Sequence, residues 1–255
     1  MSELIMTILS GLIIAVSNAI EGITGFGSTV LALPFLNLTS GLKNSVILLC
    51  IFGWLISVYI IFRSWKDIEL KEFRRIIAWC APGVPVGLLL FRYLAPEILC
   101  ILLGAFMIYA GISGWHGMKS IKAIPSAEDA KKSILLKLAL FAGGIIQGAF
   151  GTGGPFVVIY ATRVLKNKAL FRITLSLLWF TINSTRLAIW GVQGVLSDIQ
   201  LWKLAAFITP FWLAGAAAGD YLHSRVSEYH FKLGVYALLA IAGVVMLLNN
   251  LLKVV

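Results

Sequence analysis

The sequence contains few charged residues. Lysine, arginine, aspartate and glutamate together make up 13% of its 255 residues, and aspartate and glutamate contribute only 11. Soluble domains carry about 25% charged residues, so this chain lacks the polar surface that a protein of its length needs in water. It has instead 60% hydrophobic residues and a mean hydropathy of +0.94. These values predict an all-α integral membrane protein with several transmembrane helices.

The sequence also lacks the residue patterns of a metal or catalytic site. Its three cysteines, Cys50, Cys80 and Cys100, lie in apolar runs without a CxxC spacing, and we interpret them as small hydrophobic side chains. The histidines lie near predicted loops, and neither HExxH nor GxSxG occurs. We therefore expect no enzymatic activity, no catalytic residues, no metal and no cofactor.

The net charge of +10 has two interpretations. Nucleic-acid binding would require basic residues gathered on one face, but here they lie in short runs between apolar segments. The positive-inside rule for membrane proteins explains this distribution better. We therefore expect the lipid bilayer, and not nucleic acid, as a partner, and the sequence leaves a homo-oligomer open.

A glycine-rich break occurs twice in the apolar sequence. The first copy runs from Glu21 to Ser28 (EGITGFGS) and the second from Gln147 to Pro155 (QGAFGTGGP). At one constant offset the glycines at positions 22, 25 and 27 align with those at 148, 151 and 153, and Glu21 aligns with Gln147. A single copy would be typical of close helix packing in a bilayer. Two copies, each near the start of one half of the chain, indicate an internal duplication.

The apolar segments follow the same order in both halves. In the first half, 1–115, an apolar stretch at 4–38 is broken at 22–28, and Pro34 is expected to end or kink its second piece. Further predicted spans of about 20 residues follow at 44–62, 76–91 and 97–115. After a polar linker at 116–133, the second half, 134–255, has a broken stretch at 134–162 and predicted spans at 170–191, 203–221 and 230–252. The chain is thus expected to form one transmembrane domain, 1–255, with about eight hydrophobic segments.

The basic residues favour one orientation of the two halves. If each broken stretch is a hairpin that enters and leaves on one side, most of the 21 lysines and arginines fall on one face of the membrane. If each stretch crosses once, the two faces share them more evenly. The hairpin reading gives each half a broken-helix hairpin plus three spans, so the halves are inverted repeats with both termini outside and the linker in the cytoplasm. The first apolar run has no basic residue before Leu4 and leads into the glycine break, so we expect it to be retained rather than cleaved.

The paired GxxGFG and GxFGxGGP segments, the lysine-rich linker and the GxxxG spans resemble the sulfite exporter TauE/SafE-like family, also called the 4-toluene sulfonate uptake permease family. The resemblance covers nearly the whole chain, and its strongest anchors are 22–34 and 148–155. It implies a multi-pass bacterial inner-membrane transporter of small sulfur-containing anions, with export as the expected direction. There are two alternatives. The protein takes up anions through the same site, or it is a membrane partner or sensor that does not transport.

The two glycine breaks are the candidate substrate site. A helix broken within the membrane leaves backbone N–H groups that lipid cannot satisfy, and the N-terminal end of a half-helix attracts anions. The residues expected to bind an oxyanion are Gly25, Gly27, Ser28, Thr29, Gly151, Thr152, Gly153 and Gly154. The alternative is that the glycines only allow helices to pack closely.

Two charged residues within apolar segments complete the candidate site. Arg186 lies deep in the span at 170–191 beside Asn183, where a positive charge is costly unless it meets a partner or a cavity. It is expected to attract the substrate; alternatively it snorkels or pairs with Glu21. Glu21 is interpreted as the only carboxylate well inside an apolar stretch. It is the candidate for proton coupling, because a buried carboxyl can bind and release a proton, whereas pairing with Arg186 would make it structural.

Overall fold

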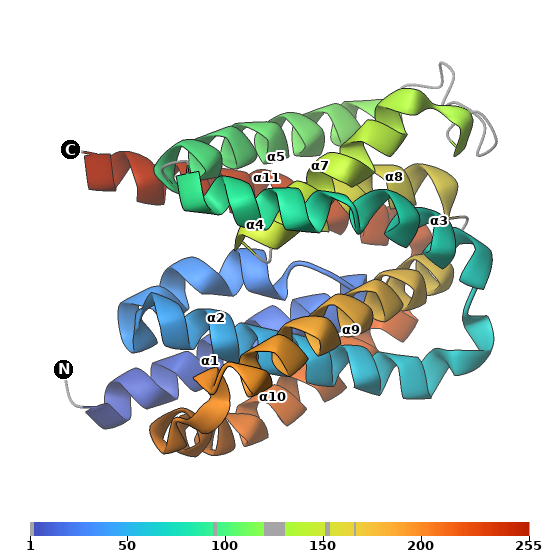
Figure 1. The fold of residues 1–255 in the computed structure, drawn as a ribbon. Coiled ribbons are helices and arrows are strands. Elements are labelled where there is room, and N and C mark those ends of the chain that lie inside the picture. Colours follow the sequence, from blue (N-terminus) through green and yellow to red (C-terminus); the bar gives the residue numbers. More distant parts are fainter. Residues whose placement is uncertain (1–2, 94–95, 120–130, 151–153, 166, 255) are drawn as a thin grey trace. The chain divides into compact units, whose positions relative to one another are not determined.

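The computed structural model describes residues 3–93, 96–119, 131–150, 154–165 and 167–254, and within these ranges the chain is helical, without strands. The chain divides into two compact units. The first unit comprises Met1–Glu69 and Arg172–Val226, and the second comprises Leu70–Phe171 and Ser227–Val255. Each unit therefore combines segments from both halves of the sequence (Figure 1).

The first unit begins with a helical hairpin. Helix α1 (Glu3–Thr24) ends at the first glycine break, and α2 (Ser28–Ser64) begins directly after it. The chain then runs back along α1, because the Ser10 hydroxyl near the start of α1 donates to Thr39 Oγ1 at 2.7 Å. The first broken stretch is thus a hairpin of two antiparallel helices.

Helix α2 consists of two pieces that meet at Gly41, where φ is 72° and ψ is 158°. Pro34 was expected to end or kink the first of these pieces, but the helix continues through Pro34 and the residue with non-helical backbone angles inside α2 is Gly41. Glycine adopts the left-handed region at little steric cost, and the chain changes direction there. The predicted span at 44–62 lies in the second piece of α2, which the short η1 (Trp65–Asp67) follows.

Helix α10 (Ile199–Arg225) packs along α1 in the same direction, since Ala15 meets Gly215 and Ile23 meets His223. A Cβ atom added to Gly22 would lie 3.0 Å from Gly219 Cα, so these glycines bring the two backbones into direct contact. Helix α9 (Lys168–Val192), whose residues from Arg172 on belong to the first unit, is joined to α10 through η2 (Val195–Ser197).

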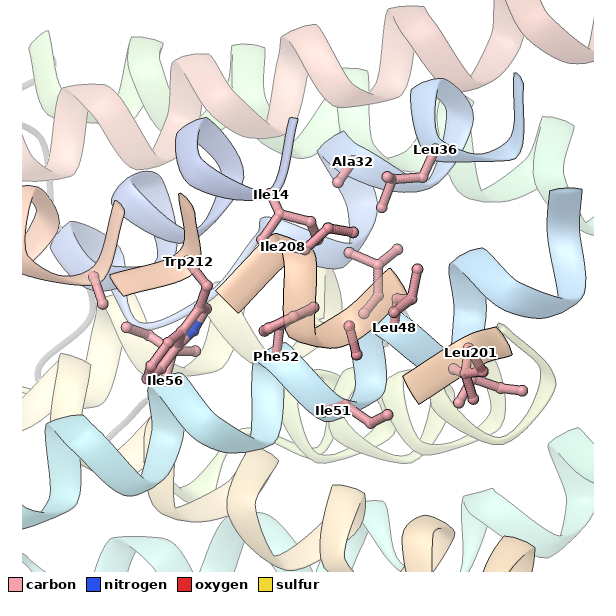
Figure 2. Close-up of a cluster of buried hydrophobic side chains, with 14 of the residues drawn as sticks. Ile14, Ala32, Leu36, Leu48, Ile51, Phe52, Ile56, Leu201, Ile208 and Trp212 are labelled. Atoms are coloured by element: carbon pink, nitrogen blue, oxygen red, sulfur yellow. The ribbon is translucent and has the colours of Figure 1, made fainter. Parts of the chain in front are cut away.

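A buried hydrophobic cluster holds α1, α2 and α10 together. Its members include Ile14 on α1, Phe52 on the second piece of α2, and Ile208 on α10 (Figure 2). The rings of Phe52 and Trp212 stack with centroids 6.4 Å apart. These side chains fix the helices around the glycine break by apolar packing.

The second unit contains α3 (Leu70–Cys80), α4 (Gly83–Tyr93), α5 (Pro96–Lys119), α7 (Ile134–Phe150), α8 (Gly154–Val164) and α11 (Glu228–Val254). The predicted single span at 76–91 is divided between α3 and α4, and the break falls at Ala81 and Pro82. Proline removes a helical N–H and disfavours helical geometry in the preceding residue. Helices α3 and α4 pack on α7, where Gly144 and Gly148 meet the carbonyls of Cys80 and Val84.

Helices α5 and α11 of the second unit pack against each other in opposite directions. A Cβ atom at Gly104 would lie 3.0 Å from the Gly243 carbonyl oxygen, and one at Gly111 would lie 2.7 Å from that of Tyr236. Small residues thus allow the close approach that apolar helices use in a membrane.

Three helices in the described ranges are long and apolar enough to cross a membrane, namely Leu4–Thr24, Lys43–Asp67 and Ile199–Arg225. They include the predicted spans at 44–62 and 203–221. Shorter apolar helices run over Ile134–Gly148 and Tyr229–Val245. The all-α membrane class is therefore confirmed, whereas the count of eight segments stays a prediction.

Candidate functional site

The first glycine break is a tight turn between α1 and α2. Gly25 has φ of 78° and Gly27 has φ of 102°, so both occupy backbone conformations that side chains disfavour. The Thr24 hydroxyl donates to the Phe26 carbonyl at 2.7 Å, and the Gly25 N–H donates to the Glu21 carbonyl at 2.6 Å. Several backbone groups that the break frees from the helices are thus satisfied within the turn.

Glu21 reaches across this break to the start of α2. Its carboxylate accepts hydrogen bonds from the hydroxyl and the backbone N–H of Ser28, and the Glu21 side chain is buried. The half-helix N-terminus expected to receive a substrate oxyanion therefore holds a carboxylate of the protein itself. Thr29, the next residue, is partly exposed.

Helices α9 and α10 hold the turn from outside. The Trp179 indole N–H donates to the Gly25 carbonyl at 2.9 Å, and His223 Nδ1 donates to the Ile23 carbonyl at 2.7 Å. A Cβ atom at Gly25 would lie 2.9 Å from the Cα atom and the carbonyl oxygen of Arg172. The glycine at position 25 is therefore needed both for its φ and for the close approach of α9.

Next to this turn lies a charged cluster that the sequence did not reveal. Arg172 Nη2 donates to Asp220 Oδ1 at 2.9 Å, Tyr59 OH donates to Asp220 Oδ2 at 3.3 Å, and Arg63 Nε lies 3.4 Å from the same oxygen. The Arg172 side chain is only 4% exposed, and its Nε has no hydrogen-bond partner among the described residues. The cluster carries two positive charges and one negative charge.

Asn183 and Arg186 lie further along α9 than the residues that hold the turn. Asn183 Nδ2 faces Gly53 in the second piece of α2, and the Arg186 guanidinium stacks over the Trp190 ring at 4.9 Å from its centroid. Seven residues separate Trp179 from Arg186, which corresponds to about 10 Å along a helix. Arg186 makes no ion pair within the described ranges, and the partner of Glu21 is Ser28 rather than Arg186.

The second glycine break belongs to the second unit. Helix α7 ends at Phe150 and α8 begins at Gly154, which is buried, while Gly151, Thr152 and Gly153 lie outside the described residues. Gln147, which aligns with Glu21, is buried in the last turn of α7. The two broken stretches thus both consist of separate helices.

A second buried carboxylate, Glu72, lies at the start of α3 in the second unit. It accepts from Arg75 at 2.7 Å and from the Tyr160 hydroxyl at 3.2 Å, and it pairs with Lys131 at 3.0 Å. Burial acts to lower the pKa of Arg75, but its contacts with Tyr160 and Glu72 raise that pKa above its ordinary value, so Arg75 stays charged. The sequence did not single out Glu72, because it lies in a run of charged residues and not inside an apolar stretch as Glu21 does.

Within the described part of the chain, no group of three or more His, Cys, Asp or Glu side chains is placed to hold a metal ion. The first unit contains charged residues buried beside helices of membrane-spanning composition, and the second unit contains the buried carboxylate of Glu72 together with shorter apolar helices. These features define an integral membrane protein with ionisable groups at broken helices, which is typical of transporters.

Comparison with known proteins identifies the family. The model of the family described as sulfite exporter TauE/SafE matches residues 9–246, so the chain belongs to this family of membrane transporters, whose members are not enzymes. The chain is 32% identical over 133 residues to a probable sulfite/organosulfonate exporter TauE from Cupriavidus necator, covering 51% of this chain and 49% of that protein. It is 21% identical over 184 residues to a probable inner membrane transporter protein TsaS from Comamonas testosteroni, covering 71% and 73%. No solved structure matches this chain.

Proposed function

We propose that this protein is a secondary transporter that exports small sulfur-containing oxyanions, such as sulfite or a sulfonate, across the bacterial inner membrane. The observation that carries the proposal is Arg186, a positive charge within an apolar helix that has no acidic partner in the described ranges. An arginine in a membrane costs about 2.5–3.5 kcal/mol even on the most lenient scale. A bound oxyanion would supply the missing negative charge, and the names of both relatives fit a transporter of this kind.

The surroundings of Arg186 suit an oxyanion. The guanidinium group can donate two parallel hydrogen bonds to a sulfite or sulfonate group, and stacking on Trp190 holds its plane. The Asn183 amide lies about one turn before it on α9 and adds a neutral donor. In this proposal the oxyanion binds first to Arg186 and Asn183 and then reaches the turn at Gly25, Gly27 and Thr29.

Glu21 couples this movement to protons. While its carboxylate accepts the two donors of Ser28, a substrate oxyanion cannot use them, because both groups are acceptors that carry negative charge. Protonation of Glu21 weakens its hold and frees these donors. The corresponding break in the second half has the neutral Gln147 in place of Glu21, so in this proposal the proton is bound and released in the first half.

The two halves are inverted repeats of one transporter domain, 1–255, with the linker at 116–133 in the cytoplasm. Equivalent contacts inside the units support the internal duplication on which this proposal rests: Ala15 meets Gly215 as Phe141 meets Gly83. In both pairs the helices run in the same direction. The contact of Gly104 with Gly243 likewise has its counterpart in that of Tyr236 with Gly111.

A flux experiment tests the proposed function. Proteoliposomes that contain the purified protein are loaded with labelled sulfite, taurine, sulfate or thiosulfate. Efflux of the label is followed with and without a pH gradient. We expect saturable flux of sulfite or a sulfonate that responds to the gradient. Protein-free liposomes are the control. If no anion leaves the proteoliposomes faster than it leaves the protein-free liposomes, the proposal is contradicted. If the anion instead accumulates inside the proteoliposomes when the pH gradient is reversed, this result would favour uptake over export.

A further inference from the structure

The first unit has a polar cavity at the end opposite its glycine turn. The cavity has a volume of about 690 Å³ and lies between the first turns of α1, the break in α2 at Gly41 and the first turn of α10. Its polar lining includes Ser10, Thr39, Ser40, Asn44, Gln200 and Lys203. No acidic side chain is among its lining residues in the described part of the chain.

Three hydroxyl groups meet at one wall of this cavity. Ser10 Oγ lies 2.7 Å from Thr39 Oγ1 and 3.2 Å from Ser40 Oγ, and the latter two oxygens are 3.4 Å apart. A hydroxyl group can turn to donate to an acceptor that enters. A cluster of this kind therefore offers adaptable donors to an oxyanion.

Two helices begin at the cavity. The second piece of α2 starts after Gly41, and Asn44 in its first turn lines the cavity; α10 starts at Ile199, and Gln200 and Lys203 line it. The N-terminal ends of helices carry partial positive charge, and Lys203 adds a full one that has no ion pair within the described residues. Asp198 caps α10 by accepting the Gln200 N–H at 2.9 Å, but it is exposed and outside the lining.

The second unit has a buried carboxylate near the start of α3, the helix that follows a matching Asp-Ile pair. Asp67-Ile68 before α3 aligns with Asp198-Ile199 before α10, and the same offset aligns Glu72 with Lys203. Glu72 is a buried anion surrounded by Arg75, Lys131 and Tyr160. In the first unit Lys203 is an exposed positive charge that lines the cavity, where an anion that enters can pair with it.

We infer that this cavity is a second anion-binding site, a vestibule that takes sulfite, sulfate or sulfonate groups before they reach Arg186. The inference rests on the proposed function, because a vestibule serves only a protein that moves anions. Arg186 interacts electrostatically with Cys50, which lies six residues beyond Asn44, or about 9 Å along α2. The first unit thus carries one positive charge at the cavity and another at Arg186 on α9.

Thiol labelling of purified protein in detergent tests the vestibule without transport. In Ser40→Cys, we compare the reaction rates of an anionic (sulfonatoethyl) and a cationic (trimethylammonioethyl) methanethiosulfonate, with the unsubstituted protein as the background for native cysteines. We expect the anionic reagent to be favoured, sulfate to slow its reaction, and Lys203→Gln to lower the anionic-to-cationic rate ratio by about threefold to tenfold. Lys203→Arg should keep the ratio.

Lys43→Gln is the matched control, because Lys43 is exposed near the same break but does not line the cavity. An equal loss of the ratio in Lys43→Gln and Lys203→Gln, or no protection by sulfate, would overturn the vestibule. If labelling behaves as expected but proteoliposomes carry no anion, the transport proposal fails and the binding site stands. If flux depends on Arg186 but labelling ignores Lys203, only the vestibule is wrong.

Discussion

Replacing Asp220 by asparagine should destabilise the first unit strongly, because among the described residues Asp220 is the only ion-pair partner of the buried Arg172. Arg172 is 4% exposed and its Nη2 lies 2.9 Å from Asp220 Oδ1. Removing one partner of a buried ion pair costs about 3–5 kcal/mol, because it leaves an uncompensated charge. For a protein of this size each kcal/mol shifts Tm by about 2–4 °C, so Asp220→Asn should lower Tm by roughly 6–20 °C.

The other contact of Asp220 serves as an internal control. Arg63 is 65% exposed and lies 3.4 Å from Asp220 Oδ2, so its pairing contributes at most about 1 kcal/mol. Arg63→Ala should therefore lower Tm by at most about 4 °C. The assay is thermal unfolding in detergent, followed by intrinsic fluorescence. A Tm for Asp220→Asn within 2 °C of the wild type, or equal shifts for the two variants, would refute the reasoning.

Three further predictions concern the turn and the topology. Gly25→Ala should destabilise the protein by about 1–3 kcal/mol in the same assay, because of its φ of 78° and the contact with α9; Gly191→Ala, which meets nothing within 4 Å, should be tolerated. Glu21→Gln should make sulfite flux insensitive to a pH gradient, and retained sensitivity would place the coupling group elsewhere. In intact cells, Ser126→Cys in the linker should resist an impermeant thiol reagent, and rapid labelling would invert the proposed topology.

The glycine turn was predictable because it depends on local sequence. Gly25 and Gly27 adopt left-handed conformations that interrupt a helix wherever they occur, and hydropathy alone indicates the long apolar helices on either side. The break at Gly41 was missed because Pro34, seven residues earlier, is the stronger local signal. The folded structure was needed to show that α2 breaks at Gly41 and not at Pro34.

The charged contacts depend on the fold and were not predictable in the same way. Arg172 and Asp220 are 48 residues apart in sequence and meet only because the fold brings this point of α9 to α10. Glu72 meets Tyr160 across 88 residues, so its burial could not be read from the charged run that contains it. Asn183 and Arg186 were singled out by their depth in a span, which does not give their distance from the turn.

Buried charges divide along the first unit into compensated and uncompensated groups. Near the turn, Asp220 neutralises the buried charge of Arg172, and the Ser28 hydroxyl donates to the carboxylate of Glu21. Further along α9, Arg186 stacks over the Trp190 ring and makes no ion pair within the described residues. In a membrane the uncompensated group is the one that a substrate can stabilise most.

The initial rate of labelled sulfite flux in proteoliposomes containing Arg186→Ala tests the central claim most directly. A hydrogen bond to a charged group contributes about 1.5–3 kcal/mol, so loss of Arg186 should lower flux at subsaturating sulfite by about tenfold or more. Arg225→Ala, at the end of α10 with its guanidinium over Tyr221, is the matched control and should keep the wild-type rate. Wild-type flux in Arg186→Ala would contradict the account.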